Sequence, residues 1–551
     1  MLVSRDAPPR LWRAAFLVAL VPAGLCAALG SLRAPLWLDE ILYYYLQDDL
    51  ALRAAEIGRP ASRIAPYFSN FFFCDLQRLA QKALGTIGLT IRSEPEAVLR
   101  ILPLASFVGA CLVLWASFRR SSGPVDALLG TLVFSSMPLV LYYGFEARVY
   151  AFTAFLVVVL LAALERLPER LGPRHVVAFA ALGLVTAHSQ LWTVCLFAVL
   201  AADAGLRLVS TRKAGSDVLA RLAASLPALA LIASEYLYMK ATDPGRPVYP
   251  PFLPQPVGFT LYELLVSNFS GPLHLQYVVL RRHEGGEVLA FCGAALLGGL
   301  IAFAWRSGVS PRRRAIGVAV AALGLCATIA ITLGFFQHAR YHLPLLAALM
   351  LAIGPPRTTL ARGLSAALIL LNMLLLPDLI EETDRKSDGR RLAGYVAWRF
   401  PDRAAGLIFQ NVVTGGYQLP THSIATDFYL NVLHPERPAV PLYEFPGLEH
   451  INGRRGVYDL FAAGPEGLER IMKSTPEAWD RVLEEAPPNL VLVHPVWGVP
   501  GSQEQVSALI RTLEAGRTRR RTATFAMNGF PHLFAVEFTA VEPKPPPPAS
   551  R

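Results

Sequence analysis

The stretch Leu-Trp-Leu-Asp-Glu-Ile-Leu-Tyr-Tyr-Tyr, residues 36–45, follows an apolar run near the start of the chain. It places two adjacent carboxylates, Asp39 and Glu40, at the end of that run and between apolar and aromatic side chains. An ionised carboxylate beside hydrocarbon costs a few kcal/mol unless it is paired or hydrated, so such groups are candidates for function. The alternative is an ordinary cap on an interfacial helix. The pair predicts a membrane protein whose chemistry lies at one surface of the bilayer.

The composition of the whole chain also indicates a membrane protein. Hydrophobic residues make up 54% of the 551 residues, and charged residues make up only 17%, which is unlike a soluble domain. Every cysteine except Cys74, which stands in a polar stretch, lies inside an apolar run, so neither a disulfide framework nor a cysteine-based metal site is predicted. The first apolar run, residues 11–30, lacks a small-residue cleavage pattern and is predicted to be a retained signal anchor.

Apolar runs of spanning length recur up to residue 380. The long run 176–208 is divided in two at the polar cluster His188-Ser189-Gln190, although a re-entrant hairpin is the alternative there. In total, the apolar runs predict about eleven transmembrane helices. The other runs are 11–30, 97–118, 124–143, 149–164, 218–239, 287–305, 315–335, 341–354 and 363–380.

Basic residues mark every second connection between these runs, which is the positive-inside bias of inner-membrane proteins. The basic clusters lie near residues 5–13, 119–120, 166–174, 207–213, 306–314 and 357–362. The bias puts the N-terminus in the cytoplasm, and it puts loops 31–96 and 240–286 and everything after residue 380 on the extracytoplasmic side. This topology accounts for most of the net charge of +10, so nucleic-acid binding is not predicted.

The composition turns polar after the membrane domain, which is predicted to cover residues 1–380. Residues 381–542 alternate amphipathic helix with short apolar runs and predict an extracytoplasmic α/β domain. Its last two strands, near 522–527 and 533–538, are separated by a turn at Asn528-Gly529-Phe530-Pro531. The proline-rich tail 543–551 is predicted to be disordered. No glycine-rich phosphate loop is found, so soluble nucleotide binding is not supported.

Two arginines, Arg148 and Arg340, stand in short outer connections where the positive-inside bias disfavours arginine. Arg148 shares its turn with Glu146, and Arg340 is followed by Tyr341. Because a guanidinium fork matches the oxygens of a phosphate, the two arginines predict a clamp on a phosphate group. The alternative for Glu146 and Arg148 is a local ion pair, which contributes little at an exposed surface.

Four motifs in order along the chain resemble those of the bacterial GT-C glycosyltransferases related to protein O-mannosyltransferases and lipid A aminoarabinose transferases. They are LWLDE at 36–40, SEPEAVLRILP at 93–103, YYGFEARVYAF at 142–152 and ARYHLPL at 339–345. The likeness extends to KSDGRRLAGY at 386–395, the start of an outer α/β domain. Many of these enzymes carry a His-Pro-Pro-Leu-Tyr-Tyr stretch in the first outer loop, whereas this chain has Ile-Ala-Pro-Tyr-Phe at 64–68 and lacks the histidine.

The resemblance implies a polyprenyl-phosphate-linked sugar as donor and a hydroxyl group as acceptor, with inversion at the sugar carbon. Carried over, Asp39 is the base that deprotonates the acceptor, and Glu40 positions the acceptor or holds Asp39. The acceptor is a glycolipid, a polysaccharide or a protein on the extracytoplasmic face of the inner membrane. Such a transfer needs one positioned base and stabilisation of the departing phosphate.

The donor-phosphate site implied by the resemblance takes its residues from the two outer turns. Arg148 and Arg340 neutralise the leaving phosphate, Glu146 orients Arg148, and Tyr150 and Tyr341 complete the set. No cofactor and no metal are expected, because arginines supply the positive charge and no cluster of His and carboxylate residues has metal-ligand spacing.

Two other functions stay open from the sequence. A ligase or polymerase acting on undecaprenyl-diphosphate glycans would also use outer arginines. A transporter of lipids or glycans would place ionisable residues near the bilayer midplane and show inverted repeats, but the sequence shows no repeat and its unexplained charges lie at one face. The sequence leaves the sugar, the prenyl chain and the acceptor undefined.

Overall fold

A computed structural model describes most of residues 71–242, 286–306, 343–380, 389–445 and 486–540, with short gaps inside these ranges, and single residues elsewhere. The chain packs as two compact units. The first, here called the helical unit, comprises Met1–Ala34 and Leu46–Asp384, and the second, the α/β unit, comprises Pro35–Tyr45 and Arg385–Arg551. The segment Pro35–Tyr45, which the sequence assigns to the first outer loop of the membrane domain, therefore packs with the C-terminal residues.

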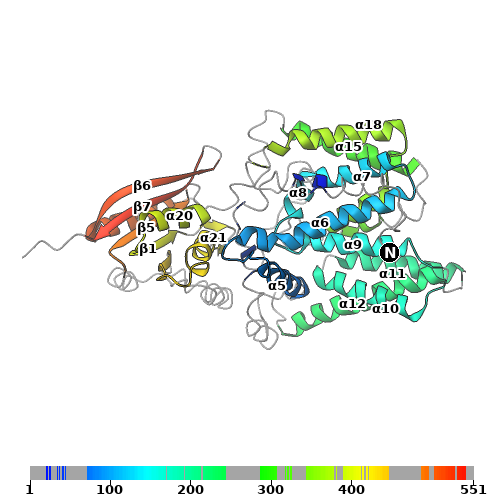
Figure 1. The fold of residues 1–551 in the computed structure, drawn as a ribbon, viewed down its shortest axis with the longest axis horizontal. Coiled ribbons are helices and arrows are strands. Elements are labelled where there is room, and N and C mark those ends of the chain that lie inside the picture. Colours follow the sequence, from blue (N-terminus) through cyan, green and yellow to red (C-terminus); the bar gives the residue numbers. More distant parts are fainter. Residues whose placement is uncertain are drawn as a thin grey trace, which may run out of the picture. The chain divides into compact units, whose positions relative to one another are not determined.

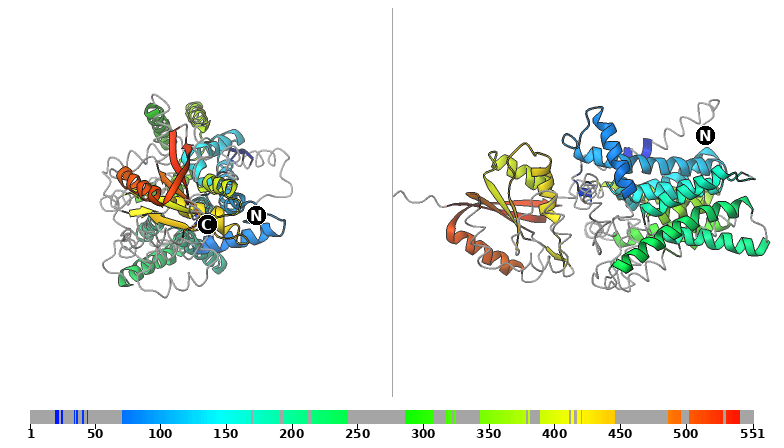
Figure 2. Two further views of the ribbon diagram at one scale, coloured as in Figure 1. Left: turned by 90° about the vertical axis from the view of Figure 1, so that its left-hand side faces the viewer. Right: turned by 90° about the horizontal axis from the view of Figure 1, so that it is seen from below.

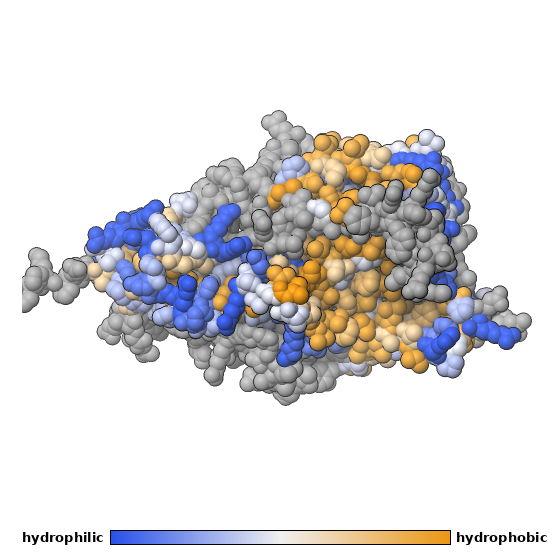
Figure 3. Space-filling view, viewed as in Figure 1, coloured by the Kyte–Doolittle hydropathy of each residue, from blue (hydrophilic) through white to orange (hydrophobic). Residues whose placement is uncertain are grey.

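The helical unit consists of apolar helices, of which α6, α9, α10, α11 and α12 run side by side (Figures 1 and 2). Its described helices are α5 (Phe71–Gly85), α6 (Pro95–Arg119), α7 (Pro124–Ser136), α8 (Pro138–Gly144), α9 (Tyr150–Leu164), α10 (Pro173–Ser189), α11 (Val194–Thr211), α12 (Ser216–Thr242), α15 (Gly286–Arg306), α17 (Leu343–Ile353) and α18 (Thr359–Leu374). Hydrophobic side chains cover much of this unit on the face shown in Figure 3. The side chains of Leu226, Leu370 and Leu374 in this unit are more than half exposed, as suits a surface in contact with lipid.

The helices follow the apolar runs of the sequence. Among the described residues, α6 and Ser216–Ser234 of α12 are each long and apolar enough to cross a membrane, and α7 with α8 is a third candidate that bends by 73°. The break predicted inside run 176–208 is confirmed, because α10 ends at Ser189 and α11 begins at Val194, whereas its reading as two separate spans stays a prediction. The total of about eleven spans stays a prediction. Most of the predicted signal anchor and most of loop 240–286 lie outside the described residues.

Two prolines shape the helices that lead to the candidate site. Met137 precedes Pro138 and is extended (φ −60°, ψ 127°), because a residue before proline is driven out of the helical region. Helix α7 ends there, and α8 begins with proline at its first position. Inside α6, Pro103 has no N–H to donate to the carbonyl of Leu99. Gln77 of α5, which is fully buried, donates to that carbonyl from Nε2 at 2.6 Å and so replaces the missing bond.

Helix α5 corrects one expectation from the sequence. Cys74 was predicted in a polar loop but is buried in α5, whose first turn packs on α9. The ring of Phe73 lies 5.7 Å from that of Phe152. The stretch looked polar because α5 is amphipathic, with one face turned to the neighbouring helices and the other face charged.

The α/β unit is built on a five-stranded sheet in the order β4-β1-β5-β7-β6. Its strands are β1 (Ala405–Gln410), β4 (Leu442–Phe445), β5 (Asn489–Pro495), β6 (Arg517–Met527) and β7 (Phe530–Ala540), and its helical segments are α20 (Gly389–Arg399), α21 (Thr421–Asp427), η3 (Phe428–Val432) and α25 (Ser502–Gly516). A separate ribbon joins β2 (Val412–Thr414) to β3 (Tyr417–Leu419). Strand β1 pairs in parallel with β4 and β5, and the predicted closing pair is confirmed as the antiparallel strands β6 and β7.

The two faces of the sheet are covered by different helices. Val536 and Phe538 of β7 pack on Leu509 and Leu513 of α25. Glu537, between them in the strand, points to the opposite face, where the Tyr395 hydroxyl of α20 donates to its Oε1. Arg399 of α20 adds an ion pair at 3.2 Å. Burial, together with the bond to Glu537, raises the pKa of Tyr395 to about 12, so this link stays protonated at physiological pH.

Candidate functional site

Residues 145–149 connect α8 to α9 and form a tight, buried turn, here called the 145–149 turn. The N–H of Arg148 donates to the carbonyl of Glu146 at 2.6 Å. Glu146 is 1% exposed and Arg148 is 5% exposed. The two side chains therefore do not form the exposed ion pair that the sequence left as an alternative. Burying a guanidinium and a carboxylate is costly, so their retention here points to a use for the charges.

Aromatic rings surround the guanidinium of Arg148. Its Cζ lies 4.9 Å from the centre of the Tyr150 ring, and Tyr143 packs edge-on against Tyr150 at 5.7 Å. A cation over an aromatic ring contributes up to about 2 kcal/mol when both are desolvated. The aromatic residues of YYGFEARVY thus hold the arginine in one orientation, which is a role that the sequence did not assign to Tyr143.

A second buried arginine, Arg100 of α6, approaches the same turn. Its Cζ lies 5.6 Å from the centre of the Phe145 ring, and its Nη1 donates to the carbonyl of Ala34 at 2.6 Å. Arg100 is fully buried, and it ties Ala34, which follows the first apolar run, to the start of α6. The sequence contained the signal, an arginine inside an otherwise apolar stretch of the motif SEPEAVLRILP, but sequence reasoning gave it no role.

The end of α10 meets the start of α9 beside the turn. The Thr153 hydroxyl donates to the Ser189 hydroxyl at 2.9 Å, and both side chains are buried. Thr153 is also bonded to the carbonyl of Val149, the last residue of the turn. The helix ends of α6, α9 and α10 therefore converge on the 145–149 turn. The sequence treated Ser189 only as part of a break between two spans.

The segment Pro35–Tyr45 is anchored within the α/β unit. The N–H of Leu36 donates to the Tyr429 hydroxyl at 2.6 Å, and the ring of Tyr44 packs edge-on against Phe428 at 5.5 Å. Glu40 is helical and fully buried. Both anchoring residues, Phe428 and Tyr429, belong to η3.

The structure thus places Glu146 and Arg148 in one turn, next to Tyr150 at the start of α9, and Glu40 on an anchored segment. The remaining predicted site residues lie outside the described part of the chain. They are Asp39, Arg340 and Tyr341.

The Tyr429 hydroxyl is expected to control the placement of the carboxylate segment. In Tyr429→Phe the buried Leu36 N–H loses its acceptor, so activity per folded molecule is expected to fall on the order of tenfold. Tyr395→Phe is the matched control, since it removes a hydroxyl from the same unit but touches Glu537 instead. Its expected effect is a lower unfolding temperature with unchanged turnover per folded molecule. Equal turnover of the two variants would show that Tyr429 has no special role.

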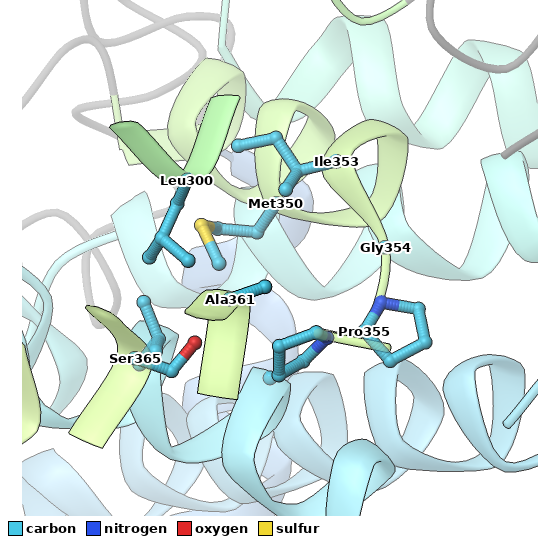
Figure 4. A pocket seen from close by; sticks show the side chains of 10 residues that line it. Leu300, Met350, Ile353, Gly354, Pro355, Ala361 and Ser365 are labelled. Carbon is cyan, nitrogen blue, oxygen red and sulfur yellow. The ribbon is translucent and has the colours of Figure 1, made fainter. Parts of the chain in front are cut away.

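A small cavity lies elsewhere in the helical unit, between α7, α15, α17 and α18 (Figure 4). Its volume of about 20 Å³ holds a water molecule but not a sugar. The lining is apolar around Leu300 and Met350, and the Ser365 hydroxyl, which hydrogen-bonds to no residue that the structure describes, is suited to such a water. This cavity is therefore not the substrate site.

Over the described residues, no three His, Cys, Asp or Glu side chains are grouped as metal ligands. The expected independence of metal ions stays a prediction. What the 145–149 turn offers instead is a guanidinium held in a low-dielectric setting. Its donors are suited to an anion with several oxygens, such as a phosphate.

Comparison with solved structures adds a match along nearly the whole chain. The crystal structure of ArnT from Cupriavidus metallidurans, bound to undecaprenyl phosphate, aligns with a TM-score of 0.54 over 96% of this chain and 98% of that chain. The chain therefore shares the fold of this ArnT structure. The sequence identity of 14% makes this a likeness of fold. No family model matches the sequence, and no curated protein matches it.

This fold confirms the polytopic helical class that the hydropathy predicted. It also agrees with the family resemblance of the four motifs.

Proposed function

We propose that this protein is a glycosyltransferase that moves a sugar from a polyprenyl-phosphate-linked donor to a hydroxyl acceptor. The observation that carries the proposal is Arg148, a buried guanidinium held against Tyr150 where three helix ends converge. It occurs in a chain with the fold of a protein that was crystallised with undecaprenyl phosphate. A phosphate is the ligand that such an arginine suits best.

The proposed reaction is a single displacement. Asp39 takes the proton from the acceptor hydroxyl, and the acceptor oxygen forms a bond to the anomeric carbon from the side opposite the phosphate. The bond from that carbon to the phosphate oxygen breaks, and polyprenyl phosphate leaves with the electron pair. The configuration at the sugar carbon is inverted. Arg148 and Arg340 offset the negative charge that grows on the leaving phosphate, and Glu146 orients Arg148.

The α/β unit has a proposed role in this reaction. Because η3 anchors the segment that carries Asp39 and Glu40, this unit holds the catalytic carboxylates as well as any acceptor that it binds. The α/β unit and the site are proposed to lie at the extracytoplasmic face of the inner membrane, as the positive-inside bias predicts.

The proposal is tested by release of undecaprenyl phosphate from a panel of undecaprenyl-phosphate-linked hexoses and pentoses. Purified protein is incubated with each donor and with cell-envelope lipids and polysaccharides as acceptors. At least one donor is expected to lose its sugar to an acceptor, with inverted stereochemistry in the product. Transfer only from diphosphate-linked glycans would instead identify the ligase or polymerase alternative, and absence of transfer from every donor would contradict the proposal.

Metal independence is a separate expectation of the same mechanism. Treatment with EDTA, followed by desalting, is expected to leave the rate of undecaprenyl phosphate release unchanged, because arginines supply the positive charge at the phosphate. The measurement is the initial rate before and after chelation. Loss of activity that Mg²⁺ or Mn²⁺ restores would show that a cation shares this task.

A further inference from the structure

We propose that Gln190, at the end of α10, binds the transferred sugar through a hydroxyl group and so helps to select the donor. This inference rests on the proposed function and adds to it a residue that recognises the sugar rather than the phosphate. Sequence reasoning treated the cluster around Gln190 only as a break between two spans.

The side chain of Gln190 is buried but has no protein partner in the described part of the chain. The residue is 6% exposed, and neither its Nε2 nor its Oε1 hydrogen-bonds to a described residue. A buried amide without partners is unfavourable, and native proteins rarely retain one without a reason. The missing partner is therefore expected to be a ligand.

The backbone of Gln190 is held in place by hydrogen bonds to its carbonyl group. The residue is extended (φ −164°, ψ 126°) where α10 ends. Its carbonyl accepts hydrogen bonds from the Thr193 N–H at 3.1 Å and from the Thr193 hydroxyl at 2.7 Å. The carbonyl of Gln190 is thus paired, whereas its side-chain amide is not.

Gln190 belongs to the surroundings of the 145–149 turn. Its neighbour Ser189 is bonded to Thr153 at 2.9 Å, and the Thr153 hydroxyl is bonded to the carbonyl of Val149 at 3.1 Å. Val149 directly follows Arg148. A short chain of hydrogen bonds thus links the residue before Gln190 to the residue after the proposed phosphate ligand.

The chemistry of the amide indicates which part of the donor it meets. An amide carries two donor hydrogens and an acceptor oxygen, whereas a fully ionised phosphate only accepts. A phosphate would leave Oε1 of Gln190 unpaired. A sugar hydroxyl both donates and accepts, so it satisfies both ends of the amide. Arg148 then contacts the phosphate, and Gln190 contacts the sugar attached to it.

Gln77 offers a matched comparison, because it is the same residue type, is buried, and lies in the same unit. It has a structural partner, the Leu99 carbonyl at 2.6 Å. Replacing each glutamine by methionine keeps its approximate shape and removes its hydrogen-bonding atoms. Gln77→Met breaks a bond within the protein, whereas Gln190→Met removes an unpaired group from it. Gln77→Met is therefore expected to lower the stability of the ligand-free protein, whereas Gln190→Met is not.

The experiment uses full-length protein, undecaprenyl phosphate, and the panel donor that the wild type cleaves fastest. For Gln190→Met, kcat/KM for the sugar-linked donor is expected to fall on the order of tenfold to a hundredfold. Binding of undecaprenyl phosphate, which has no sugar, should change less than about twofold, since the amide is not a phosphate ligand. The ligand-free unfolding temperature should stay the same or rise. Gln77→Met should lower that temperature and leave the KM unchanged.

Three results would overturn the inference while leaving wild-type transfer, and thus the proposed function, intact. The first is a kcat/KM of Gln190→Met within about threefold of wild type. The second is a parallel loss of undecaprenyl phosphate binding, which would place Gln190 at the phosphate. The third is a fall in unfolding temperature equal to that of Gln77→Met, which would show that a buried water already pairs the amide in the ligand-free protein. Absence of sugar transfer by the wild-type protein would instead contradict the proposed function.

Discussion

Asp39→Asn is expected to abolish sugar transfer while membrane insertion and the unfolding temperature stay as in the wild type. The substitution keeps the shape of the side chain but removes its ability to accept a proton from the acceptor hydroxyl. General bases of this kind contribute roughly 10²–10⁴-fold to the rate. The measurement is kcat/KM for the sugar-linked donor, with circular dichroism and thermal unfolding as checks on the fold.

Glu40→Gln is the comparison that separates the two adjacent carboxylates. Glu40 is fully buried within the segment that η3 anchors, so its loss is expected to reduce activity less than loss of Asp39 and to lower stability more. Activity of Asp39→Asn within about threefold of wild type, which is a change in barrier well under about 1.4 kcal/mol, would remove Asp39 as the base. A larger loss in Glu40→Gln would transfer that role to Glu40.

Arg148→Ala is expected to reduce donor turnover by about 10²–10³-fold, because the charge that forms on the departing phosphate loses a preorganised partner. Arg148→Lys keeps the charge but loses both the bidentate fork and the guanidinium contact with the Tyr150 ring, so activity is expected to fall on the order of tenfold. Both effects are measured as kcat/KM for the sugar-linked donor and as the affinity for undecaprenyl phosphate.

Arg100→Lys is the matched control for Arg148→Lys. Both arginines are buried against the 145–149 turn, but Arg100 contacts the Ala34 carbonyl and the Phe145 ring. Its replacement is expected to lower the unfolding temperature without a selective loss of undecaprenyl phosphate binding. If both lysine variants lose stability alike and neither changes donor use, Arg148 is a structural arginine.

The shared clamp requires Arg148 and Arg340 to act on one phosphate. Since residues that act as a unit are not additive, the double alanine variant is expected to lose little more activity than the worse single variant. Losses that multiply fully would show that the two arginines act independently. In that case the clamp is wrong, and the role of Asp39 as base is unaffected.

Local pattern in the sequence was sufficient for the apolar helices of the helical unit, but not for the amphipathic α5, and for part of the α/β unit. Long apolar runs predicted α6, α9, α12 and α15, and the polar residues 188–190 predicted where α10 ends. The closing strands β6 and β7 were recognised because apolar alternation on both sides of an Asn-Gly turn is a local signal. These features depend on residues within one or two turns of each other, which is the range over which hydropathy and turn chemistry act.

The same reasoning found Glu146, Arg148 and Tyr150, because charges at the end of an apolar run conflict with the bilayer and stand out in the sequence. It could not show that the turn is buried, or that Tyr143 and Arg100 close around it. Each of these contacts joins side chains from different elements of the fold, and a sequence pattern records only the element to which a residue belongs.

The sequence by itself thus determined the membrane class, the helices, and the two charged motifs that carry the proposed chemistry. The tertiary structure decided which distant residues support those motifs. Leu36 and Tyr429 are hydrogen-bonded although they are 393 positions apart, and the buried amide of Gln190 could be recognised only once its surroundings were known. The physical reason is that burial and hydrogen-bond pairing are properties of the packed chain, since they depend on every element that surrounds a group in space.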